Sequence, residues 1–217
     1  ATAVEMECFG LDAPYAAGFQ EKVKGDNVDA LITGLGIPAT AFHLGRILAM
    51  NTYDLVMNTG LAGSFSADLV PGSLVEVVSD EFGDLGAEDH DNYVSGFELG
   101  ISGKDELPFR NGRLIPLSSD IKPLKISRVN GATVNTVHGN DQSIADFKRR
   151  SSAEIETMEG AAVFYACNVM QIPSLQIRAI SNAVEARNRS VWKVPEALQA
   201  LTVFFELHWK EITSAYS

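Results

Sequence analysis

Hydrophobic and polar positions follow two different spacings along this chain, which predicts short strands separated by helices. Continuous apolar runs predict buried strands at residues 28–33, 54–59, 73–78 and 174–180. Apolar residues at helical spacing predict helices at residues 36–50, 142–150 and 195–212. A strand at 153–158 leads into an uncharged run at 160–170, which predicts a buried helix. Strands that alternate with helices indicate an α/β fold, with helices on both faces of a sheet.

Glycine and asparagine mark the predicted turns. The segment GLAGS, residues 60–64, is predicted to be the turn that ends the second strand. Residues 80–120 are rich in Gly, Asp, Asn and Pro, and predict a loop region with a short hairpin at Asn111-Gly112. Asn130-Gly131 lies between two alternating runs and predicts another hairpin. No internal repeat or change in composition divides the chain, so a single domain over residues 1–217 is expected.

Composition narrows the expected partners and compartment. The 217 residues are 46% hydrophobic, enough for one large core, and the net charge of −11 disfavours nucleic acid or an anionic membrane as partner. No apolar run reaches the roughly 18 residues of a membrane span, and no signal peptide heads the chain. Two distant cysteines, Cys8 and Cys167, fit a reducing cytoplasm. The sequence opens without an initiator Met, as though it began just after a first strand.

Ligands of such sheets bind beyond the carboxyl ends of the strands. That rule selects residues 60–64, 158–160 and 181–183, and the loop after Val78. Glu159 lies at one of these ends, directly before the uncharged run, where its carboxylate either stabilises the helix end or holds a ligand. Asn182 is also ambiguous, because asparagine commonly ends strands and builds turns. On the residues alone, both interpretations stay open.

Three further motifs are weaker. GLGIPA, residues 34–39, lacks the third glycine of a dinucleotide fingerprint, and TGLAGS lacks the lysine of a phosphate-binding loop. EDHDN, residues 88–92, favours a solvated acidic loop, because the four histidines show no recurring spacing with cysteines or acids. No metal site is therefore expected.

Five segments taken together do carry a resemblance. NTGLAGSF, FGDLGAED, GATVNTV, ETMEGAAVFYAC and LQIRAISNAVEARNRSVW follow one another over nearly the whole chain and resemble the purine nucleoside phosphorylase and nucleosidase superfamily. The resemblance implies a three-layer α/β/α sandwich around a mixed, partly barrel-like central sheet, assembled as a homo-oligomer. It implies N-glycosidic cleavage of a small-molecule purine nucleoside without metal or organic cofactor. FGDLGAED narrows it to a hydrolase branch whose substrate is an inosine derivative with a benzoate on the 5′ side.

The residues suit the roles that the resemblance assigns to them. An ionised carboxylate accepts from two vicinal hydroxyls, so Glu159 falls on the ribose-binding role, with Met158 as an apolar surface under the sugar. The backbone around Gly60, Ala62 and Gly63 is expected to approach the substrate closely.

Asn182 bears on the purine. Nucleosidases that act on adenine nucleosides carry an aspartate at this position. An asparagine offers an NH₂ donor to a 6-oxo group and a carbonyl acceptor to a protonated N7, which favours hypoxanthine as the leaving group.

The first residues favour water as the nucleophile. Phosphorylases of this superfamily begin with a phosphate loop that contains glycine and arginine, whereas this chain reads ATAVEME there. Glu5 falls where the nucleosidases have their water-activating glutamate, and a carboxylate can act as a general base. A surface acid is the alternative for Glu5.

The 5′ group requires an apolar slot and a cation. Phe82 and the 84–89 loop are candidate walls, and Arg187 or Arg189 the candidate cation, in place of ordinary surface charges. Three alternatives remain: a nucleosidase of the methylthioadenosine/adenosylhomocysteine type, a purine nucleoside phosphorylase, and a non-catalytic nucleoside-binding relative.

Overall fold

The centre of the molecule is a small closed barrel. The computed structural model describes residues 20–22, 28–90, 92–117 and 124–214. The barrel strands run in the order β3 (Val56–Ser64), β8 (Ile155–Thr157), β7 (Ser127–Thr133), β4 (Leu74–Ser79) and β9 (Ser174–Ala183). The pairs β3–β9, β4–β7 and β7–β8 are parallel, whereas β3–β8 and β4–β9 are antiparallel. The predicted mixed, partly barrel-like sheet is therefore confirmed.

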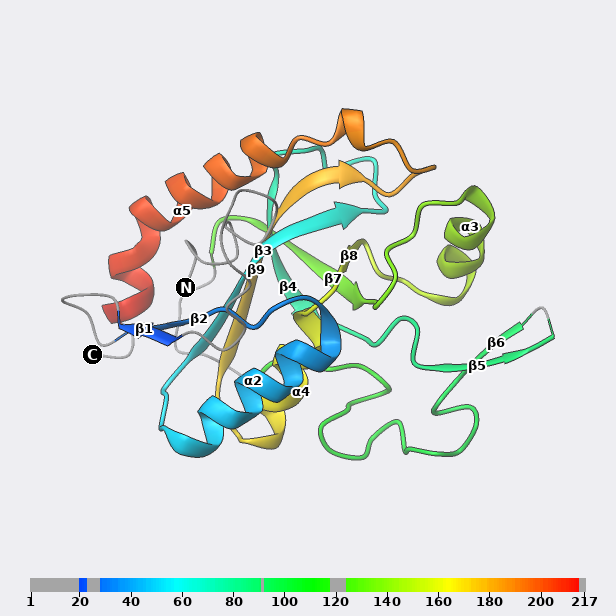
Figure 1. The fold of residues 1–217 in the computed structure, drawn as a ribbon, viewed down its shortest axis with the longest axis horizontal. Coiled ribbons are helices and arrows are strands. Elements are labelled where there is room, and N and C mark those ends of the chain that lie inside the picture. The colour runs from blue at the N-terminus through cyan, green and yellow to red at the C-terminus, as the bar shows by residue number, and fades with distance from the viewer. Residues whose placement is uncertain (1–19, 23–27, 91, 118–123, 215–217) are drawn as a thin grey trace.

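Helices cover the barrel on two sides, which gives the expected layered arrangement (Figure 1). Helix α5 (Val194–Ser214) packs on β9 and β3 through an apolar cluster that includes Leu201, Phe205 and Ile177. On the other side α4 (Gly160–Val169) packs on β7 and β9, and α2 (Gly36–Met50) covers α4. Burying apolar faces between these layers provides the main driving force for folding.

The uncharged run forms α4, the most enclosed of these helices. Phe164 and Cys167 are fully buried, and Phe164 packs in the barrel cluster with Ile155 and Val77. Burial raises the pKa of the Cys167 thiol to about 12, so this cysteine stays neutral and serves as a packing group. The prediction of a buried helix is confirmed.

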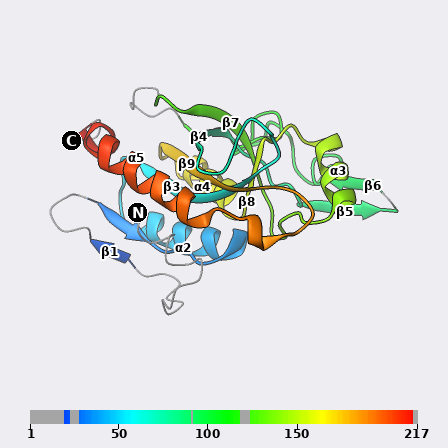
Figure 2. The ribbon, with the colours of Figure 1, turned by 90° about the horizontal axis from the view of Figure 1, so that it is seen from above.

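Smaller elements extend from this body. Strands β1 (Gln20–Lys22) and β2 (Asp29–Leu31) form an antiparallel pair, and η1 (Arg189–Val191) precedes α5. The hairpin of β5 (Gly86–Asp89) and β6 (Asn92–Ser95) lies at the same end of the molecule as α3 (Asp141–Arg150) (Figure 2). Among the residues that the structure describes, no helix is both long and apolar enough to cross a membrane.

One turn prediction is confirmed and two are wrong. Asn111 and Gly112 both have positive φ, and Arg110 bridges Arg113 across them, so the short hairpin is confirmed. The β5–β6 hairpin was not predicted, because residues 80–120 were interpreted as loop.

The Asn130-Gly131 hairpin prediction is wrong, because both residues lie inside the continuous strand β7. Glycine is needed there for close packing instead of a turn, since a Cβ at Gly131 would lie 3.0 Å from Val77 Cγ1 and 3.1 Å from Asp80 Oδ2.

Residues 60–64 do not form a turn either. They continue β3, which stays paired with β9 as far as Ser64 and Ala183. The register shifts between Ala62 and Gly63, where Ser181 is the extra residue on β9. Such a bulge re-aims neighbouring side chains.

Candidate functional site

Gly63 occupies the centre of the candidate site, between two polar residues on neighbouring strands. Its partner on β8 is Glu156 and its partner on β9 is Asn182. A Cβ at Gly63 would lie 3.4 Å from Asn182 Nδ2 and 3.5 Å from Glu156 Cγ. The nearest atom to such a Cβ would be Val184 Cγ2, at 2.9 Å, so the glycine makes room for Val184, and Asn182 and Glu156 lie on the same side of β3.

The Asn182 amide is oriented by its sequence neighbours. Its Oδ1 accepts a hydrogen bond of 2.7 Å from Ser181 Oγ, and its Nδ2 donates to the Ala183 carbonyl at 2.8 Å. The side chain is half-buried. An amide nitrogen carries two hydrogens and an amide oxygen two lone pairs, so one donor and one acceptor remain for a ligand.

Glu156 forms a buried hydrogen bond with His138. Their side chains are 4% and 12% exposed, and Glu156 Oε2 lies 2.7 Å from His138 Nδ1. Both carboxylate oxygens also accept from the His138 backbone N–H, at 3.2 and 3.3 Å. The Glu156 carboxylate thus fixes both the backbone and the ring of His138.

Glu159 lies three residues beyond Glu156, and its carboxylate does not cap its own helix. Its Oε1 accepts a 3.1 Å hydrogen bond from the backbone N–H of Gly36, at the start of α2. Gly36 has a φ of 82°, a conformation that glycine adopts easily. The carboxylate therefore lies between the N-termini of two helices, where negative charge is favoured.

Other side chains cap α4 in place of Glu159. Thr133 Oγ1 accepts from the Ala161 N–H at 2.7 Å, and Thr157 Oγ1 accepts from the Gly160 N–H at 3.2 Å. Thr133 in turn donates to Asp80, 3.1 Å away. The interpretation of Glu159 as a mere helix-end charge is therefore weakened, because the end of α4 is already satisfied.

Asp80 fixes the capping residue Thr133; we call Asp80, Thr133, Thr157 and Gln176 the Asp80 cluster. Its carboxylate is fully buried and accepts from Glu81 N–H, Thr133 Oγ1 and Gln176 Nε2. Burial raises the pKa of Asp80 to about 6, against the lowering effect of these hydrogen bonds and of Arg178. Gly160 is packed tightly against the cluster, since a Cβ there would lie 2.6 Å from Gln176 Nε2 and closer still to Asp80.

Arg187 lies in the loop that follows Asn182 and the end of β9. Its backbone N–H donates to the Gly139 carbonyl at 3.0 Å, and its guanidinium lies over Trp192, 5.5 Å from the ring centroid. A Cβ at Gly139 would lie 3.1 Å from Arg187 Cβ. Arg187 therefore packs directly beside the segment that carries His138.

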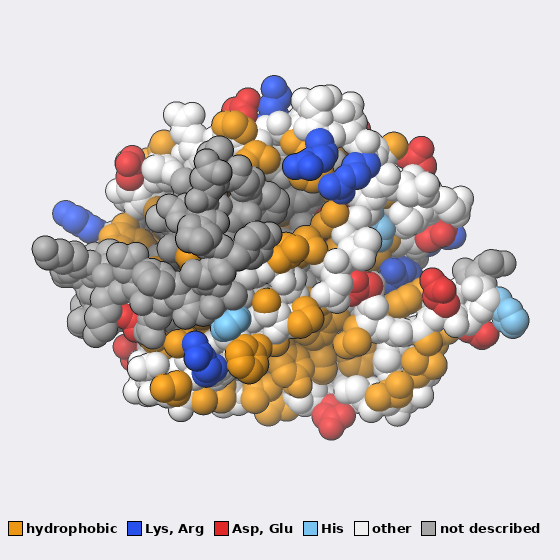
Figure 3. Space-filling model, viewed as in Figure 1, with side chains coloured by type: hydrophobic (Ala, Val, Ile, Leu, Met, Phe, Trp, Pro, Cys, Tyr) orange, Lys and Arg blue, Asp and Glu red, His pale blue; other side chains and the backbone are white. Residues whose placement is uncertain are grey.

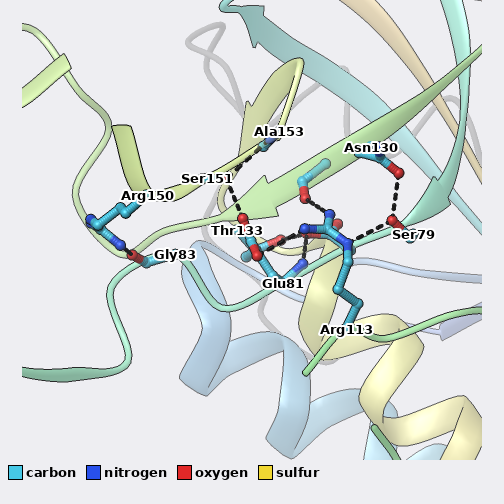
Figure 4. A network of polar contacts seen from close by, with 11 residues as sticks. Ser79, Glu81, Gly83, Arg113, Asn130, Thr133, Arg150, Ser151 and Ala153 are labelled. Carbon is cyan, nitrogen blue, oxygen red and sulfur yellow. Dashed lines mark hydrogen bonds and ion pairs between the residues drawn. The ribbon is translucent and has the colours of Figure 1, made fainter. Parts of the chain in front are cut away.

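Figure 4 shows a polar network that includes Glu81 and Gly83, the residues before and after Phe82, and the Glu81 backbone N–H joins this network to Asp80. Glu81 accepts from Arg113 Nη1 at 2.8 Å and from the Ser151 hydroxyl, and the Gly83 carbonyl accepts from Arg150 at 2.8 Å. Arg113 also donates to the Gly131 carbonyl at 2.9 Å, which ties the network to β7.

The Phe82 ring lines a cavity of about 680 Å³ together with Tyr93, Phe97, Arg150 and Tyr165. Glu159 and Asn182 are not among the residues that line it. A shallower depression of about 470 Å³ runs along α5, and it is lined by other residues that include Phe204 and His208. This cavity therefore does not include Glu159 or Asn182, although Phe82 itself bridges Thr133 on β7 and packs against the barrel cluster that contains Ala62.

The other predicted residues are placed as follows. Glu5 lies outside the described residues. Met158 is half-buried beside Glu159, Gly60 is paired with Arg178 in the middle of β3, and Ala62 packs in the barrel interior. The 84–89 segment contains the exposed strand β5. Gly63, Asn182 and Arg187 thus lie at or just beyond the ends of the parallel strands β3 and β9, whereas Met158 and Glu159 follow β8, which runs antiparallel to β3.

Sequence reasoning missed His138 and Glu156. Glu156 stands in the motif ETMEG, but only Glu159, the acid at the helix start, was predicted to be functional. His138 was considered only as a metal ligand. The available signal was a polar residue inside a short strand that is otherwise buried, and its partner became visible only in the fold.

Comparisons with known proteins agree with this architecture. The family model described as "Phosphorylase superfamily" matches residues 17–206. Futalosine hydrolase of Streptomyces coelicolor is 33% identical over 184 residues, covering 82% of this chain and 76% of the relative. Futalosine hydrolase of Acidothermus cellulolyticus is 32% identical over 206 residues, covering 88% of this chain and 80% of the relative. A crystal structure of a 5′-methylthioadenosine/S-adenosylhomocysteine nucleosidase from Colwellia psychrerythraea, in complex with adenine, superposes with a TM-score of 0.68 at 21% identity, covering 90% of this chain and 81% of that chain.

Proposed function

The chain belongs to the phosphorylase superfamily, and on that premise we propose that it hydrolyses the N-glycosidic bond of futalosine, releasing hypoxanthine and dehypoxanthine futalosine. The reaction would serve menaquinone biosynthesis in the cytoplasm. The whole of residues 1–217 would act as one domain without a cofactor.

The observation that carries this proposal is Asn182, oriented at the end of β9 beside Gly63. Its remaining N–H would donate to O6 of a 6-oxopurine, and its Oδ1 would accept from a protonated N7. An adenine nucleoside presents a 6-amino donor instead, so it would face the Asn182 N–H unfavourably. This contrast favours futalosine over a methylthioadenosine-type substrate.

Glu159 would hold the ribose. Its carboxylate accepts from Gly36 N–H and retains lone pairs for the two vicinal hydroxyls of the sugar. Because Thr133 and Thr157 cap α4, the carboxylate is available to the substrate. Met158 would contact the apolar face of the sugar, with the backbone of Gly60, Ala62 and Gly63 completing the wall.

Glu5 would act as the general base on water. The mechanism requires attack of water at C1′ while the sugar carries positive charge, and a carboxylate both accepts the water proton and repels phosphate. Hydrolysis is therefore proposed in preference to phosphorolysis. For the 5′ benzoate we propose Arg187 as the cation and Phe82 as an aromatic wall.

We also propose that the protein is a homo-oligomer. Hydrophobic side chains gather over the outer faces of α2 and α4 (Figure 3), where Phe42 is 66% exposed, Met50 74% and Val169 46%. Apolar surface of this kind is typical of an interface between subunits. Sedimentation equilibrium of the wild type and of Phe42→Lys would test it, with a monomeric wild type contradicting the proposal.

The activity is tested by incubating the purified protein with futalosine and measuring hypoxanthine by chromatography, with and without phosphate. Phosphate-independent release is expected, with inosine and methylthioadenosine as comparison substrates. Asn182→Asp is expected to lower turnover of futalosine at least about tenfold and to raise turnover of 6-aminopurine nucleosides.

Asn188→Asp is the matched control, because Asn188 is exposed and only caps η1. It should leave the preference unchanged. Turnover of methylthioadenosine but not of futalosine by the wild type would refute the proposed substrate, and strict dependence on phosphate would refute hydrolysis.

A further inference from the structure

None of the residues assigned so far can act as a general acid for the leaving purine. When the C1′–N9 bond breaks, the electron pair passes to the purine, which leaves more readily if N7 is protonated. Asn182 has no acidic proton to give, because a side-chain amide is not an acid near neutral pH. Another group near Asn182 must therefore supply the proton.

His138 is a suitable group, and Glu156 fixes which nitrogen it presents. Because the carboxylate accepts at 2.7 Å from Nδ1, the hydrogen of the neutral ring lies on Nδ1. The other nitrogen, Nε2, then takes up and releases the exchangeable proton. The Glu156 carboxylate accepts from Nδ1 whether or not Nε2 carries a proton, so the Nε2 proton is the one that can be transferred.

The Nε2 atom is also accessible. Among the described residues no group forms a hydrogen bond with Nε2, and this atom is not enclosed, since it keeps part of the 12% exposure of the side chain. The ring itself is held by aromatic packing, with its centroid 4.7 Å from that of Phe147 and 5.8 Å from that of Phe65. His138 is thus a fixed ring with one open nitrogen.

Its position matches the proposed base site. Glu156 Cγ and Asn182 Nδ2 both lie within 3.5 Å of the point where a Gly63 side chain would begin. Gly139, the next residue after His138, contacts Arg187 on the far side. His138 is therefore joined to the residues around Gly63 through Glu156, and its neighbour Gly139 is joined to the loop that carries Arg187.

We propose that His138 is the general acid that protonates the leaving purine, with Glu156 as its positioning residue; this inference rests on the proposed function. The C1′–N9 bond breaks, its electron pair moves into the purine, and the Nε2 proton of His138 passes to N7. Water oxygen bonds to C1′, its proton goes to the general base, and solvent returns a proton to His138. The protonated N7 can then donate to Asn182 Oδ1.

The test compares leaving groups that do and do not need a proton. His138→Gln and Glu156→Gln are measured with futalosine, with its 7-methyl derivative, whose N7 already carries positive charge, and with 4-nitrophenyl β-D-ribofuranoside. We expect kcat for futalosine to fall about 10²–10⁴-fold in His138→Gln, and kcat for the two activated substrates to change less than about tenfold. Glu156→Gln, which still accepts from Nδ1, should show a smaller loss with the same dependence on leaving group.

His208→Gln is the matched control, because His208 pairs with Glu211 at 3.4 Å on the exposed part of α5. It should leave all three rates unchanged. Equal losses with all substrates in folded His138→Gln, or no loss with futalosine, would overturn the role of His138 and leave the proposed function standing. Failure of the wild type to release hypoxanthine would overturn both.

Discussion

Two acids that follow parallel strands of the barrel, Asp80 after β4 and Glu159 after β8, have opposite environments. Asp80 is fully buried, accepts three hydrogen bonds from the protein and has a raised pKa of about 6. Glu159 is half-buried, and its carboxylate accepts a single hydrogen bond, from Gly36, among the described residues. Asp80 therefore belongs to the framework, whereas Glu159 keeps the capacity to bind a ligand.

The comparison shows how a framework can leave one carboxylate available. The Asp80 cluster supplies the hydroxyls that cap α4 and positions its first turn. Because Thr133 and Thr157 cap α4, the Glu159 carboxylate can accept instead from the N-terminus of α2. The buried acid and the available acid are two parts of one arrangement, and the following substitutions are designed to separate them.

The largest effect is expected from Glu159→Gln. Loss of the negative charge should lower kcat/KM about 10³-fold, equivalent to about 4 kcal/mol of transition-state stabilisation. The free energy of unfolding should change by less than about 1 kcal/mol, because this side chain does not cap α4. Steady-state kinetics and urea unfolding measure the two quantities.

Glu196→Gln provides the matched control, since Glu196 also lies in the first turn of a helix, α5, and is exposed. It should leave activity intact. A Glu159→Gln protein with full activity would show that the acid is only a helix-end charge.

Gly160→Ala should act on the framework instead. The new methyl group would lie 2.6 Å from Gln176 and against Asp80, and both of these side chains are fully buried. We expect a loss of about 3 kcal/mol or more in the free energy of unfolding. Gly45→Ala in α2 is the control, because nothing lies within 4 Å of the added Cβ, and there the change should stabilise by about 0.5–1 kcal/mol. Equal stabilities of the two variants would contradict the tight packing at Gly160.

The smallest effect is expected from Asp80→Asn, and it depends on pH. The unfolded chain releases the Asp80 proton near 3.8, whereas the native state retains it to about pH 6. The wild type therefore loses stability relative to the variant as the pH rises through that interval, by about 2 kcal/mol between pH 4 and pH 7. The buried Gln176 Oε1, which has no partner among the described residues, can accept from the new amide. Parallel stability–pH curves for both proteins would refute the raised pKa.

The sequence predicted local elements well where one pattern dominated. The uncharged run at 160–170 could only be a buried helix, and α4 ends within one residue of the prediction. Patterns that have two physical explanations led to wrong predictions. Glycine permits a turn, but it also permits close packing, and Gly131 and Gly63 serve the second use inside continuous strands.

The candidate site was predictable to the same extent. Glu159, Asn182 and Gly63 were identified mainly because their motifs resemble those of a known superfamily. On the residues alone, Glu159 and Asn182 each also had a structural explanation, since acids suit helix N-termini and asparagine commonly ends strands. His138 was not identified, because its significance lies in a contact with Glu156, 18 residues away. A single histidine in a loop carries no local signal of its partner.

The sequence by itself determined the α/β composition, the buried helix and the kind of chemistry that the strand ends can support, because these depend on residue types and their local spacing. Only the tertiary structure decided the closure of the barrel, the continuation of β3 and β9 past their predicted ends, and which acid is enclosed in the framework and which keeps a carboxylate with few hydrogen bonds. Those outcomes depend on which side chains meet across strands that are distant in sequence, and on how much water the packing excludes around each carboxylate.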